Sequence, residues 1–328
     1  MKVLIAGLGS IGRRHLRNLI ALGRKDIVLY RTHRSTMPEE ELPAVVVETD
    51  LQRALDYQPD AVIVANPTAM HLDIAIPFAK SGSSILLEKP VSNNLERVEK
   101  LRLAVKQGGG RILVGFQFRY HPGLIKAAEW IKDGAIGKPL SVHCEWGEYL
   151  PGWHPWEDYR KSYSAREDLG GGVVLTLCHP LDYLRWLMGE ISELWAFTGK
   201  VSDLEIGVED VAEIGLHFVN GAVGNLHLDY FRRPGEHRFE IIGTGGMIEW
   251  RNATGAARLY RATREDWESF LPPQRFERNN LFIAEMKHFL DVVEKKAEPI
   301  CTLDDGVRAL QLALAVHESG RTKKLVQV

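Results

Sequence analysis

Short hydrophobic runs alternate with amphipathic stretches through the first third of the chain. Runs dominated by apolar residues lie at 2–8, 26–31, 45–49, 61–66, 84–90 and 111–118. Helix-like stretches separate them, near 10–22, 69–82 and 93–107. Hydrophobic strands that alternate with helices indicate βαβ units and a doubly wound parallel sheet buried on both faces. We therefore expect an α/β domain over residues 1–121.

The remaining residues, 122–328, follow a different pattern. Residues 138–148 alternate like a half-exposed strand, residues 211–231 resemble two strands joined by the turn Asn220-Gly221, and residues 239–251 resemble a second hairpin. Helices are expected near 174–188, from Asn279 to about Val293, and over 304–319. This pattern predicts an α+β domain with an open-faced, largely antiparallel sheet, and the helix at 304–319 is expected to pack back on the first domain.

The hairpin at 211–231 has two different faces. One alternating set, Ala212, Ile214, Leu216 and Phe218, is apolar enough for a core. The other set mixes small residues with polar ones and includes His217 and, on the return strand, His227. Such a face suits a moderately polar interface between identical subunits. We predict a homodimer, or a dimer of dimers, built sheet to sheet with both histidines near the contact.

Composition narrows the class of protein. The 328 residues are 45% hydrophobic and 26% charged, and the formal net charge is -2. This balance gives no reason to expect nucleic acid or a membrane as partner, and no apolar run approaches the ~18 residues of a spanning helix. The three cysteines are scattered without metal-ligand spacing, so we expect a cytoplasmic protein with no metal site.

A glycine-rich turn follows the first strand. The segment GLGSIG places Gly7, Gly9 and Gly12 between a predicted strand and a predicted helix. In that setting the glycines allow a tight turn, close approach of a pyrophosphate, and close packing of helix on strand. The backbone amides of Ser10 and Ile11 open the helix, whose N-terminus attracts anions. The segment predicts a dinucleotide site.

The end of the second strand bears on the choice of dinucleotide. A site for NAD usually carries an acidic residue there to bind the ribose hydroxyl. Here the stretch is YRTHRS, without an acid before Glu39. Arg31, Thr32 and Arg34 offer donors suited to a 2'-phosphate. We expect NADP, with NAD as the alternative; a solvated basic loop would give the same sequence.

Further motifs occur in order along the chain. They are GLGSIGRRH at 7–15, ANPTAMH at 65–71, EKP at 88–90, GFQFRYHP at 115–122, and GGGVVLTLCHPLD at 170–182. Together with the ending LDDGVRALQLALAVHESG, they resemble the Gfo/Idh/MocA family: glucose–fructose oxidoreductase, inositol dehydrogenase and rhizopine-catabolism oxidoreductases. The resemblance spans nearly the whole chain. It implies a Rossmann domain, a second α/β domain, and oxidation or reduction of sugars and cyclitols with NAD or NADP.

The resemblance implies two catalytic residues. Lys89 of EKP would lie between nicotinamide and substrate and stabilise charge on the reacting oxygen. His179 would carry the proton, since histidine suits proton transfer near neutral pH. Many relatives have an aspartate one turn before this histidine, where this chain has Thr176. Asp182 is either an orienting partner of His179 or a structural helix residue.

Other positions are implied as cofactor contacts. They are Asn66, Pro67 and His71 after the fourth strand, Glu88 beside the lysine, and Gln117, where relatives often have asparagine near the carboxamide. His71 is equally well explained as a helix-entry residue that packs in the core.

Residues 148–168 are crowded with aromatic and charged side chains. Aromatic faces with interleaved charges suit a polar, ring-shaped ligand, whereas a packed loop or a subunit contact explains them as well. The candidate substrate-binding residues are Lys89, Arg119, Trp153, His154, Tyr159, Arg160, Arg166, Thr176 and His179.

These features predict an NADP-dependent oxidoreductase acting on a sugar, a sugar acid or a nucleotide-linked sugar, with surface-polysaccharide metabolism as one setting. Two alternatives use the same fold. One is a non-redox enzyme that cleaves glycosides with a tightly held nicotinamide. The other is a nicotinamide-binding regulator without turnover, which Thr176 keeps open and which Lys89 and His179 argue against.

Overall fold

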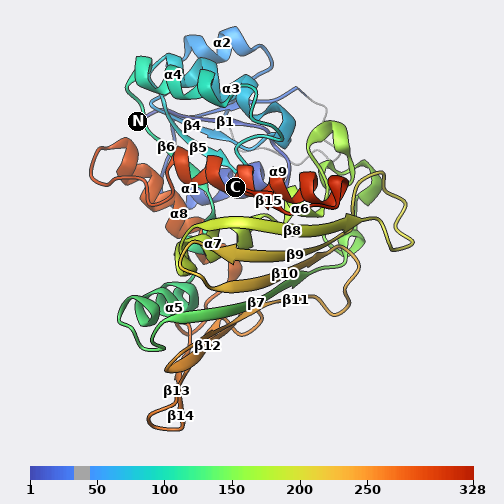
Figure 1. Cartoon of the computed structure of the whole chain (residues 1–328). Coiled ribbons are helices and arrows are strands. Elements are labelled where there is room, and N and C mark those ends of the chain that lie inside the picture. Colours follow the sequence, from blue (N-terminus) through green and yellow to red (C-terminus); the bar gives the residue numbers. More distant parts are fainter. Residues whose placement is uncertain (33–44) are drawn as a thin grey trace.

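The computed structural model describes residues 1–32 and 45–328, which form two sheets with helices packed between and around them (Figure 1). The first sheet is parallel, in the order β3-β2-β1-β4-β5-β6. Its strands are β1 (Val3–Ala6), β2 (Ile27–Tyr30), β3 (Val46–Glu48), β4 (Ala61–Val64), β5 (Ser84–Glu88) and β6 (Ile112–Gly115). Every residue of β1, β4 and β5 is buried, as expected for strands covered on both faces.

Helices connect these parallel strands. They are α1 (Ser10–Ala21), α2 (Leu51–Asp56), α3 (His71–Lys80) and α4 (Val98–Gly108), with short 3-10 turns η1 (Thr68–Met70) and η2 (Gln117–Tyr120). The doubly wound α/β fold predicted for this part of the chain is confirmed. The predicted boundary between residues 121 and 122 falls where η2 ends and α5 begins.

The second sheet is mixed. Its order is β14-β13-β12-β11-β7-β10-β9-β8-β15, and β7 and β10 run parallel at its centre while the other neighbours are antiparallel. Its strands are β7 (Pro139–Gly147), β8 (Ile191–Gly199), β9 (Val211–Phe218), β10 (Val223–Asp229), β11 (Glu236–Gly243), β12 (Gly246–Arg251), β13 (Ala256–Arg261), β14 (Asp266–Phe270) and β15 (Val326–Gln327). Both expected hairpins are present. Strands β8, β13, β14 and β15 were not expected from the sequence.

Helices of the second half lie on one side of this sheet and reach the first. They are α5 (Pro122–Lys132), α6 (Val173–Thr176), α7 (His179–Met188), α8 (Arg278–Val293) and α9 (Leu303–Thr322), with 3-10 turns η3 (Leu150–Gly152), η4 (Tyr159–Lys161), η5 (Tyr163–Ala165) and η6 (Glu167–Leu169). In Figure 1, α9 lies between the two sheets. The amide of Val114 in β6 donates to the backbone oxygen of Cys301, 3.0 Å away. Cys301 precedes α9, and Gly306 of α9 lies so close to Val114 that a Cβ there would come within 2.7 Å of the valine side chain.

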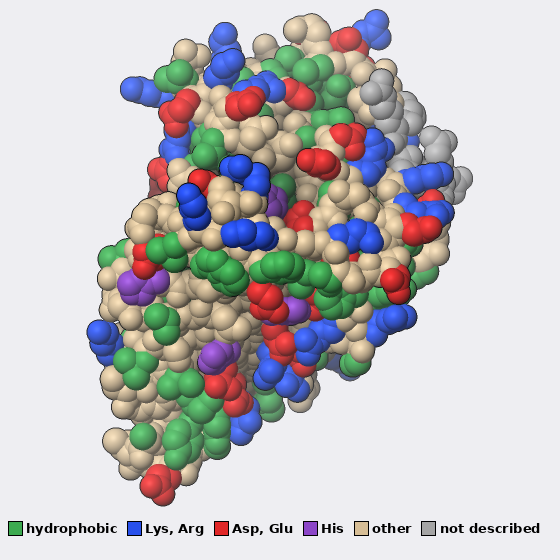
Figure 2. Space-filling model, turned by 45° about the vertical axis from the view of Figure 1, so that its right-hand side comes forward, with side chains coloured by type: hydrophobic (Ala, Val, Ile, Leu, Met, Phe, Trp, Pro, Cys, Tyr) green, Lys and Arg blue, Asp and Glu red, His purple; other side chains and the backbone are tan. Residues whose placement is uncertain are grey.

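The other face of the second sheet is open. In β9, Ala212, Ile214, Leu216 and Phe218 are buried, while Glu213 and His217 on the alternate face are exposed. Figure 2 shows hydrophobic, histidine and charged side chains side by side on this part of the molecule. Among the described residues, no helix has both the length and the hydrophobicity needed to cross a bilayer.

Candidate functional site

The glycine turn after β1 has the geometry that its sequence predicts. Gly7 has a φ of +96°, and a Cβ there would lie 2.6 Å from the backbone nitrogen of Asn66. A Cβ at Gly12 would lie 2.0 Å from the backbone oxygen of Gly7. A Cβ at Gly9, in contrast, would meet nothing within 4 Å, so open space lies beside this backbone. The turn therefore fits a pyrophosphate approaching at Gly9.

The start of α1 adds to this fit. Ser10 and Ile11 are the first helical residues, and the first turn contains no acidic side chain. The unpaired amides and partial positive charge of such a helix end attract phosphate. Gly7, Gly9, Ser10, Ile11 and Gly12 are the residues that would hold the pyrophosphate of a dinucleotide.

Only part of the predicted 2'-phosphate site is described. β2 ends at Tyr30, and the amide of the next residue, Arg31, donates to the backbone oxygen of Glu48 in β3. Thr32 is the last described residue before the gap, and Arg34 lies outside the described residues. The position of Arg31 at the carboxyl end of β2 matches the place where a ribose is recognised in this fold.

His71 supports two loops rather than facing open space. Its Nδ1 lies 2.8 Å from the backbone oxygen of Pro90, and its Nε2 lies 3.0 Å from that of Asn66. The ring is buried, and burial lowers the pKa of His71. The expectation of a direct cofactor contact from this side chain is wrong, because both ring nitrogens already meet backbone groups. Asn66 and Pro67 remain at the carboxyl end of β4, beside Gly7.

Glu88 also has a structural partner. Its Oε1 lies 2.8 Å from His15 Nε2 of α1, and the side chain is almost completely buried. Burial alone would raise the pKa of Glu88, but the hydrogen bond and charge of His15 outweigh it and the pKa is lowered. The prediction that Glu88 contacts the cofactor is corrected: its carboxylate holds α1 against the end of β5. Gln117, another predicted contact, is buried in η2.

Lys89 crosses from the first sheet to the second half of the chain. Its Nζ donates to the backbone oxygen of Thr176, 2.6 Å away. That oxygen is free to accept because Pro180, four residues later, has no amide hydrogen to offer it. The expected helix near 174–188 is for the same reason two helices, α6 and α7, with a break at residues 177–178. Thr176 thus acts through its backbone.

His179 is the first residue of α7, directly after this break. Its ring packs against three aromatic side chains, with centroids 5.4 Å from Phe116, 5.1 Å from Phe118 and 5.5 Å from Trp146. Burial, and then the charge of Lys89, hold the pKa of His179 well below its usual value. The imidazole is therefore neutral at pH 7 and can accept a proton.

Arg119 is held within the protein. Its Nε and one terminal nitrogen donate to the two carboxylate oxygens of Asp182, at 2.9 and 2.7 Å, and the other donates to the backbone oxygen of Ile300. Both side chains of the pair are buried. This pairing argues for a structural role of Arg119, and substrate binding by Arg119 stays a prediction. Asp182 likewise pairs with Arg119, so it does not orient His179.

The aromatic loop is divided between surface and site. Arg160 pairs with the half-buried Asp158 and the exposed Glu205, and the exposed Arg166 pairs with the exposed Asp168. The Tyr159 hydroxyl accepts from the amide of Glu205. Substrate binding by Tyr159, Arg160 and Arg166 stays a prediction, and these contacts show how each side chain is held without a ligand. His154 packs on Trp156, with ring centroids 5.3 Å apart, whereas Trp153 faces a pocket.

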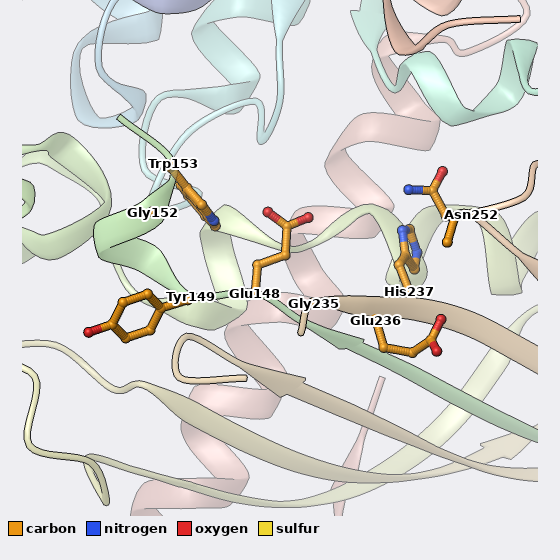
Figure 3. A pocket seen from close by; sticks show the side chains of 9 residues that line it. Glu148, Tyr149, Gly152, Trp153, Gly235, Glu236, His237 and Asn252 are labelled. Carbon is orange, nitrogen blue, oxygen red and sulfur yellow. The ribbon is translucent and has the colours of Figure 1, made fainter. Parts of the chain in front are cut away.

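That pocket, about 320 Å³, opens between the loop after β7 and the start of β11 (Figure 3). Its lining residues are Glu148, Tyr149, Gly152, Trp153, Gly235, Glu236, His237, Asn252 and Ala253. Trp146 connects this pocket to His179: its ring stacks on His237 at 4.2 Å and contacts His179, and its Nε1 donates to Glu148. In Figure 3 the indole nitrogen of Trp153 points into the space above Glu148.

Several of these residues were not predicted from the sequence. Glu148 ended a predicted strand, and His237 preceded one, so neither stood out as a ligand contact. Alternation of buried and exposed positions was the only signal for His237, which folds inward from β11. His15 carried a clearer signal, because helical spacing places it on the buried face of α1 with Leu16 and Leu19.

Comparisons with known proteins agree with this architecture. Residues 1–116 match the model of an oxidoreductase family with an NAD-binding Rossmann fold, and residues 124–249 match the GFO/IDH/MocA C-terminal domain. Myo-inositol 2-dehydrogenase of Thermotoga maritima is 28% identical over 345 residues, covering 100% of this chain and 98% of that protein. The 1,5-anhydro-D-fructose reductase of Ensifer adhaerens is 26% identical, covering 83% and 81%.

Solved structures share the whole fold. A levoglucosan dehydrogenase in complex with NADH and levoglucosan has a TM-score of 0.87 at 22% identity, covering 100% of this chain and 99% of that one. The WlbA dehydrogenase from Bordetella pertussis, in complex with NADH and UDP-GlcNAcA, has a TM-score of 0.84 at 20% identity, covering 100% and 98%. The two matched halves, in this order over nearly the full length, show that the chain belongs to the Gfo/Idh/MocA family of NAD-binding oxidoreductases.

Proposed function

We propose that this protein is an NADP-dependent oxidoreductase that acts on a carbinol or carbonyl carbon of a neutral sugar or sugar derivative. The observation that carries the proposal is the meeting of Lys89 and His179 at the break between α6 and α7. Lys89 is fixed there by the Thr176 backbone oxygen, and its charge helps to keep His179 neutral. A cation and a neutral base beside each other suit proton removal from a hydroxyl group.

The side chains have different roles in the proposed reaction. A bound nicotinamide supplies the hydride acceptor. Neutral His179 accepts the proton of the reacting hydroxyl, and the ammonium group of Lys89 hydrogen-bonds the same oxygen and stabilises its developing negative charge. Phe116, Phe118 and Trp146 exclude water around the imidazole and keep it uncharged before the reaction.

The pocket favours an uncharged substrate. Glu148 and Glu236 contribute carboxylates, and its lining contains no lysine or arginine. Arg233 lies outside this lining, where its guanidinium stacks on the ring of Tyr149 at 4.1 Å. Carboxylates and amides accept and donate hydrogen bonds to hydroxyl groups, and aromatic rings cover the apolar face of a sugar. A sugar acid would meet like charge at Glu148.

The test is a panel of neutral and acidic sugars with both oxidised nicotinamides. We expect a neutral cyclitol or sugar to be oxidised faster than the matching sugar acid.

We expect NADPH to bind at least about tenfold more tightly than NADH, because each charge-assisted contact is worth roughly 1.5–3 kcal/mol. The substitution Arg31→Ala is expected to reduce this difference in affinity. Absorbance of the reduced cofactor measures the rate of sugar oxidation, and titration calorimetry measures the affinities for NADPH and NADH. Equal affinities for NADPH and NADH would refute the preference for NADP. A nicotinamide that stays bound and never exchanges with solution would favour the alternative function, a non-redox enzyme that cleaves glycosides.

We also propose that the open face of the second sheet joins two copies of the chain, as a dimer or a dimer of dimers. Strand register places Trp195, Phe197 and Val223 on the same face as His217 and His227, and the three hydrophobic side chains are exposed. Burying them would supply the apolar centre of an interface. Light scattering behind size exclusion is expected to give a multiple of the chain mass. A mass of 37.0 kDa at micromolar concentration would contradict association.

A further inference from the structure

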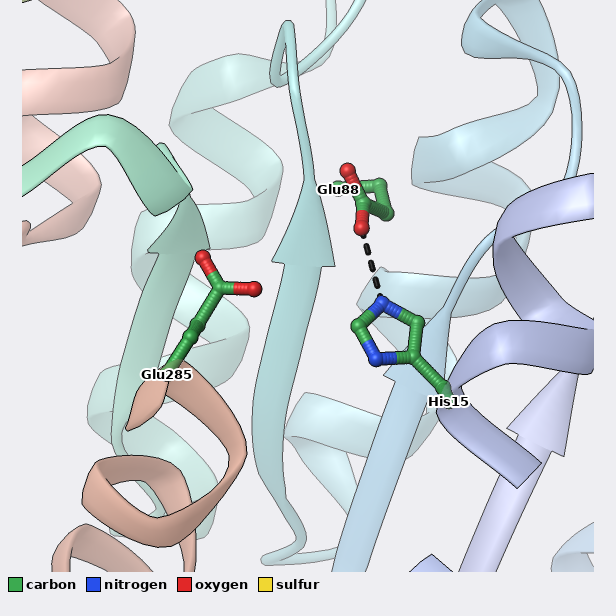
Figure 4. Close-up of side chains that lie close together, drawn as sticks. All are labelled: His15, Glu88 and Glu285. Carbon is green, nitrogen blue, oxygen red and sulfur yellow. Dashed lines mark hydrogen bonds and ion pairs between the residues drawn. The ribbon is translucent and has the colours of Figure 1, made fainter. Parts of the chain in front are cut away.

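Three ionisable side chains meet in the interior behind Lys89. They are His15 of α1, Glu88 at the end of β5 and Glu285 of α8, drawn in Figure 4. One nitrogen or oxygen atom from each lies within 4.8 Å of the other two. His15 and Glu285 are 0% exposed and Glu88 is 7% exposed. Helix α1 with its glycine turn and the end of β5 are here called the cofactor cradle. These two elements therefore meet α8 at the three side chains.

Glu285 differs from the other two. His15 Nε2 and Glu88 Oε1 form a 2.8 Å hydrogen bond, whereas both carboxyl oxygens of Glu285 lack a hydrogen-bond partner among the described residues. An ionised carboxylate without a partner in the interior costs several kcal/mol, and a neighbouring carboxylate adds to that cost. Burial, and then the charge of Glu88, raise the pKa of Glu285 well above its usual value.

The charged groups on the elements that pack against α8 do not remove this cost. They are Arg14 and His15 of α1, Glu88 at the end of β5 with the following Lys89, and Arg119 and Tyr120 of η2. Of these, Glu88 and Tyr120 interact electrostatically with Glu285. Arg14 lies over the ring of Phe282 at 4.6 Å, Arg119 is held by Asp182, and Lys89 by Thr176. Within residues 1–32 and 45–328, no ion pair joins a cation to Glu285.

We propose that Glu285 is a positioning residue, a neutral carboxylic acid that donates its proton toward Glu88 through a water molecule and so locks α8 to the cofactor cradle. Glu88 in turn connects Glu285 to two other segments of the chain. Its Oε1 bonds His15 of the helix that begins at the glycine turn, and its Oε2 accepts from the backbone amide of Lys89 at 3.3 Å. This role rests on the proposed function, since the segment it fixes carries Lys89.

The arrangement has a pH dependence of definite sign. Glu285 has a raised pKa in the folded protein, so its stabilising contribution is complete only below the ordinary pKa of a carboxyl group and is lost as pH rises from there through the raised value. Ionisation then places a second negative charge within 4.8 Å of the Glu88 carboxylate and pushes α8 away from α1 and β5. The cofactor cradle is expected to loosen on the alkaline side.

The experiment measures NADPH affinity by fluorescence from pH 6 to about 9.5, where buried glutamates ionise. We compare wild type with Glu285→Gln, which keeps the shape and cannot ionise, and with Asp291→Asn, a control at an exposed position on α8. Wild type and control are expected to lose affinity, by up to about tenfold per pH unit once Glu285 ionises, while Glu285→Gln stays constant. An identical pH profile for wild type and Glu285→Gln would overturn the proposal.

Two further outcomes are distinguished. If purified wild type holds a stoichiometric divalent cation that a chelator removes, and Glu285→Gln loses it, the three residues form a metal site and the proton assignment is wrong. If Glu285→Gln does not fold, the infrared carbonyl band of a protonated carboxyl group in wild type decides: its absence at pH 7 overturns the proposal. Absence of NADPH binding to wild type at every pH would instead refute the proposed function.

Discussion

Replacing His179 with alanine is expected to lower kcat by about 10²–10⁴-fold, the usual contribution of a general acid or base. The imidazole is the neutral base whose pKa is lowered by burial and by the charge of Lys89. The other histidine that packs on Phe118 and Trp146, His237, already meets the Tyr183 hydroxyl through its Nε2. The affinity for the cofactor is expected to stay within a few-fold, because His179 lies on α7 and not in the glycine turn. Steady-state kinetics and cofactor titration separate the two effects.

Lys89→Ala provides the companion measurement. It removes the cation that hydrogen-bonds the reacting oxygen, so we expect a loss of similar size in kcat. Lys106→Ala is the matched control, since that lysine is exposed on α4. Turnover near the wild-type value in either the His179 or the Lys89 variant would show that the residue has been given the wrong role.

Breaking the buried pair between Arg119 and Asp182 is expected to cost about 3–5 kcal/mol of unfolding free energy, because one charge is left in the interior without its partner. Asp182→Ala removes the carboxylate that accepts two hydrogen bonds from the guanidinium. Urea unfolding measures the loss. The large value distinguishes a structural pair from a substrate contact, which would leave the stability of the free protein almost unchanged.

The control for this prediction is an exposed pair. Arg97 and Asp73 form an ion pair whose side chains are 41% and 55% exposed. Asp73→Ala is expected to change stability by less than about 1 kcal/mol. The double variant Arg119→Met with Asp182→Leu is expected to recover much of the loss, since it leaves no unpaired charge. Equal, small effects of Asp182→Ala and Asp73→Ala would contradict the structural role of Arg119.

Local patterns in the sequence predicted the parts of the structure that depend on neighbours along the chain. The glycine turn at 7–12, the buried strands and the hairpin at 220–221 are of this kind, because sterics and alternation within a few residues determine them. The break before His179 was also present in the sequence as Pro180. We expected one helix there because the hydrophobic periodicity continues on both sides of the proline.

Ionic partners were not predictable in the same way. Arg119 pairs with Asp182, which is 63 positions away in the sequence, and Glu88 pairs with His15, which is 73 positions away. A single sequence contains many arginines and glutamates and does not say which of them meet. From the sequence alone, a charged residue near a motif therefore looks the same whether its side chain binds a ligand or pairs with another residue in the interior. The pairing of Arg160 and Arg166 with acidic residues two positions away was likewise not expected, although those acids stand beside them in the sequence.

The hydrogen bond between Val114 and Cys301 has a consequence for synthesis of the chain on the ribosome. β6 is the last strand of the first sheet, yet its edge is completed by a residue near the C-terminus, and α8 covers the interior side of Glu88. Until residue 301 has been synthesised, the amide of Val114 in the nucleotide-binding half lacks this partner, and the interior side of Glu88 lacks α8 until residues 278–293 have been made. Contacts between such distant segments slow folding. The first half is therefore expected to expose unpaired strand edge and apolar surface during synthesis, the surface through which folding intermediates aggregate.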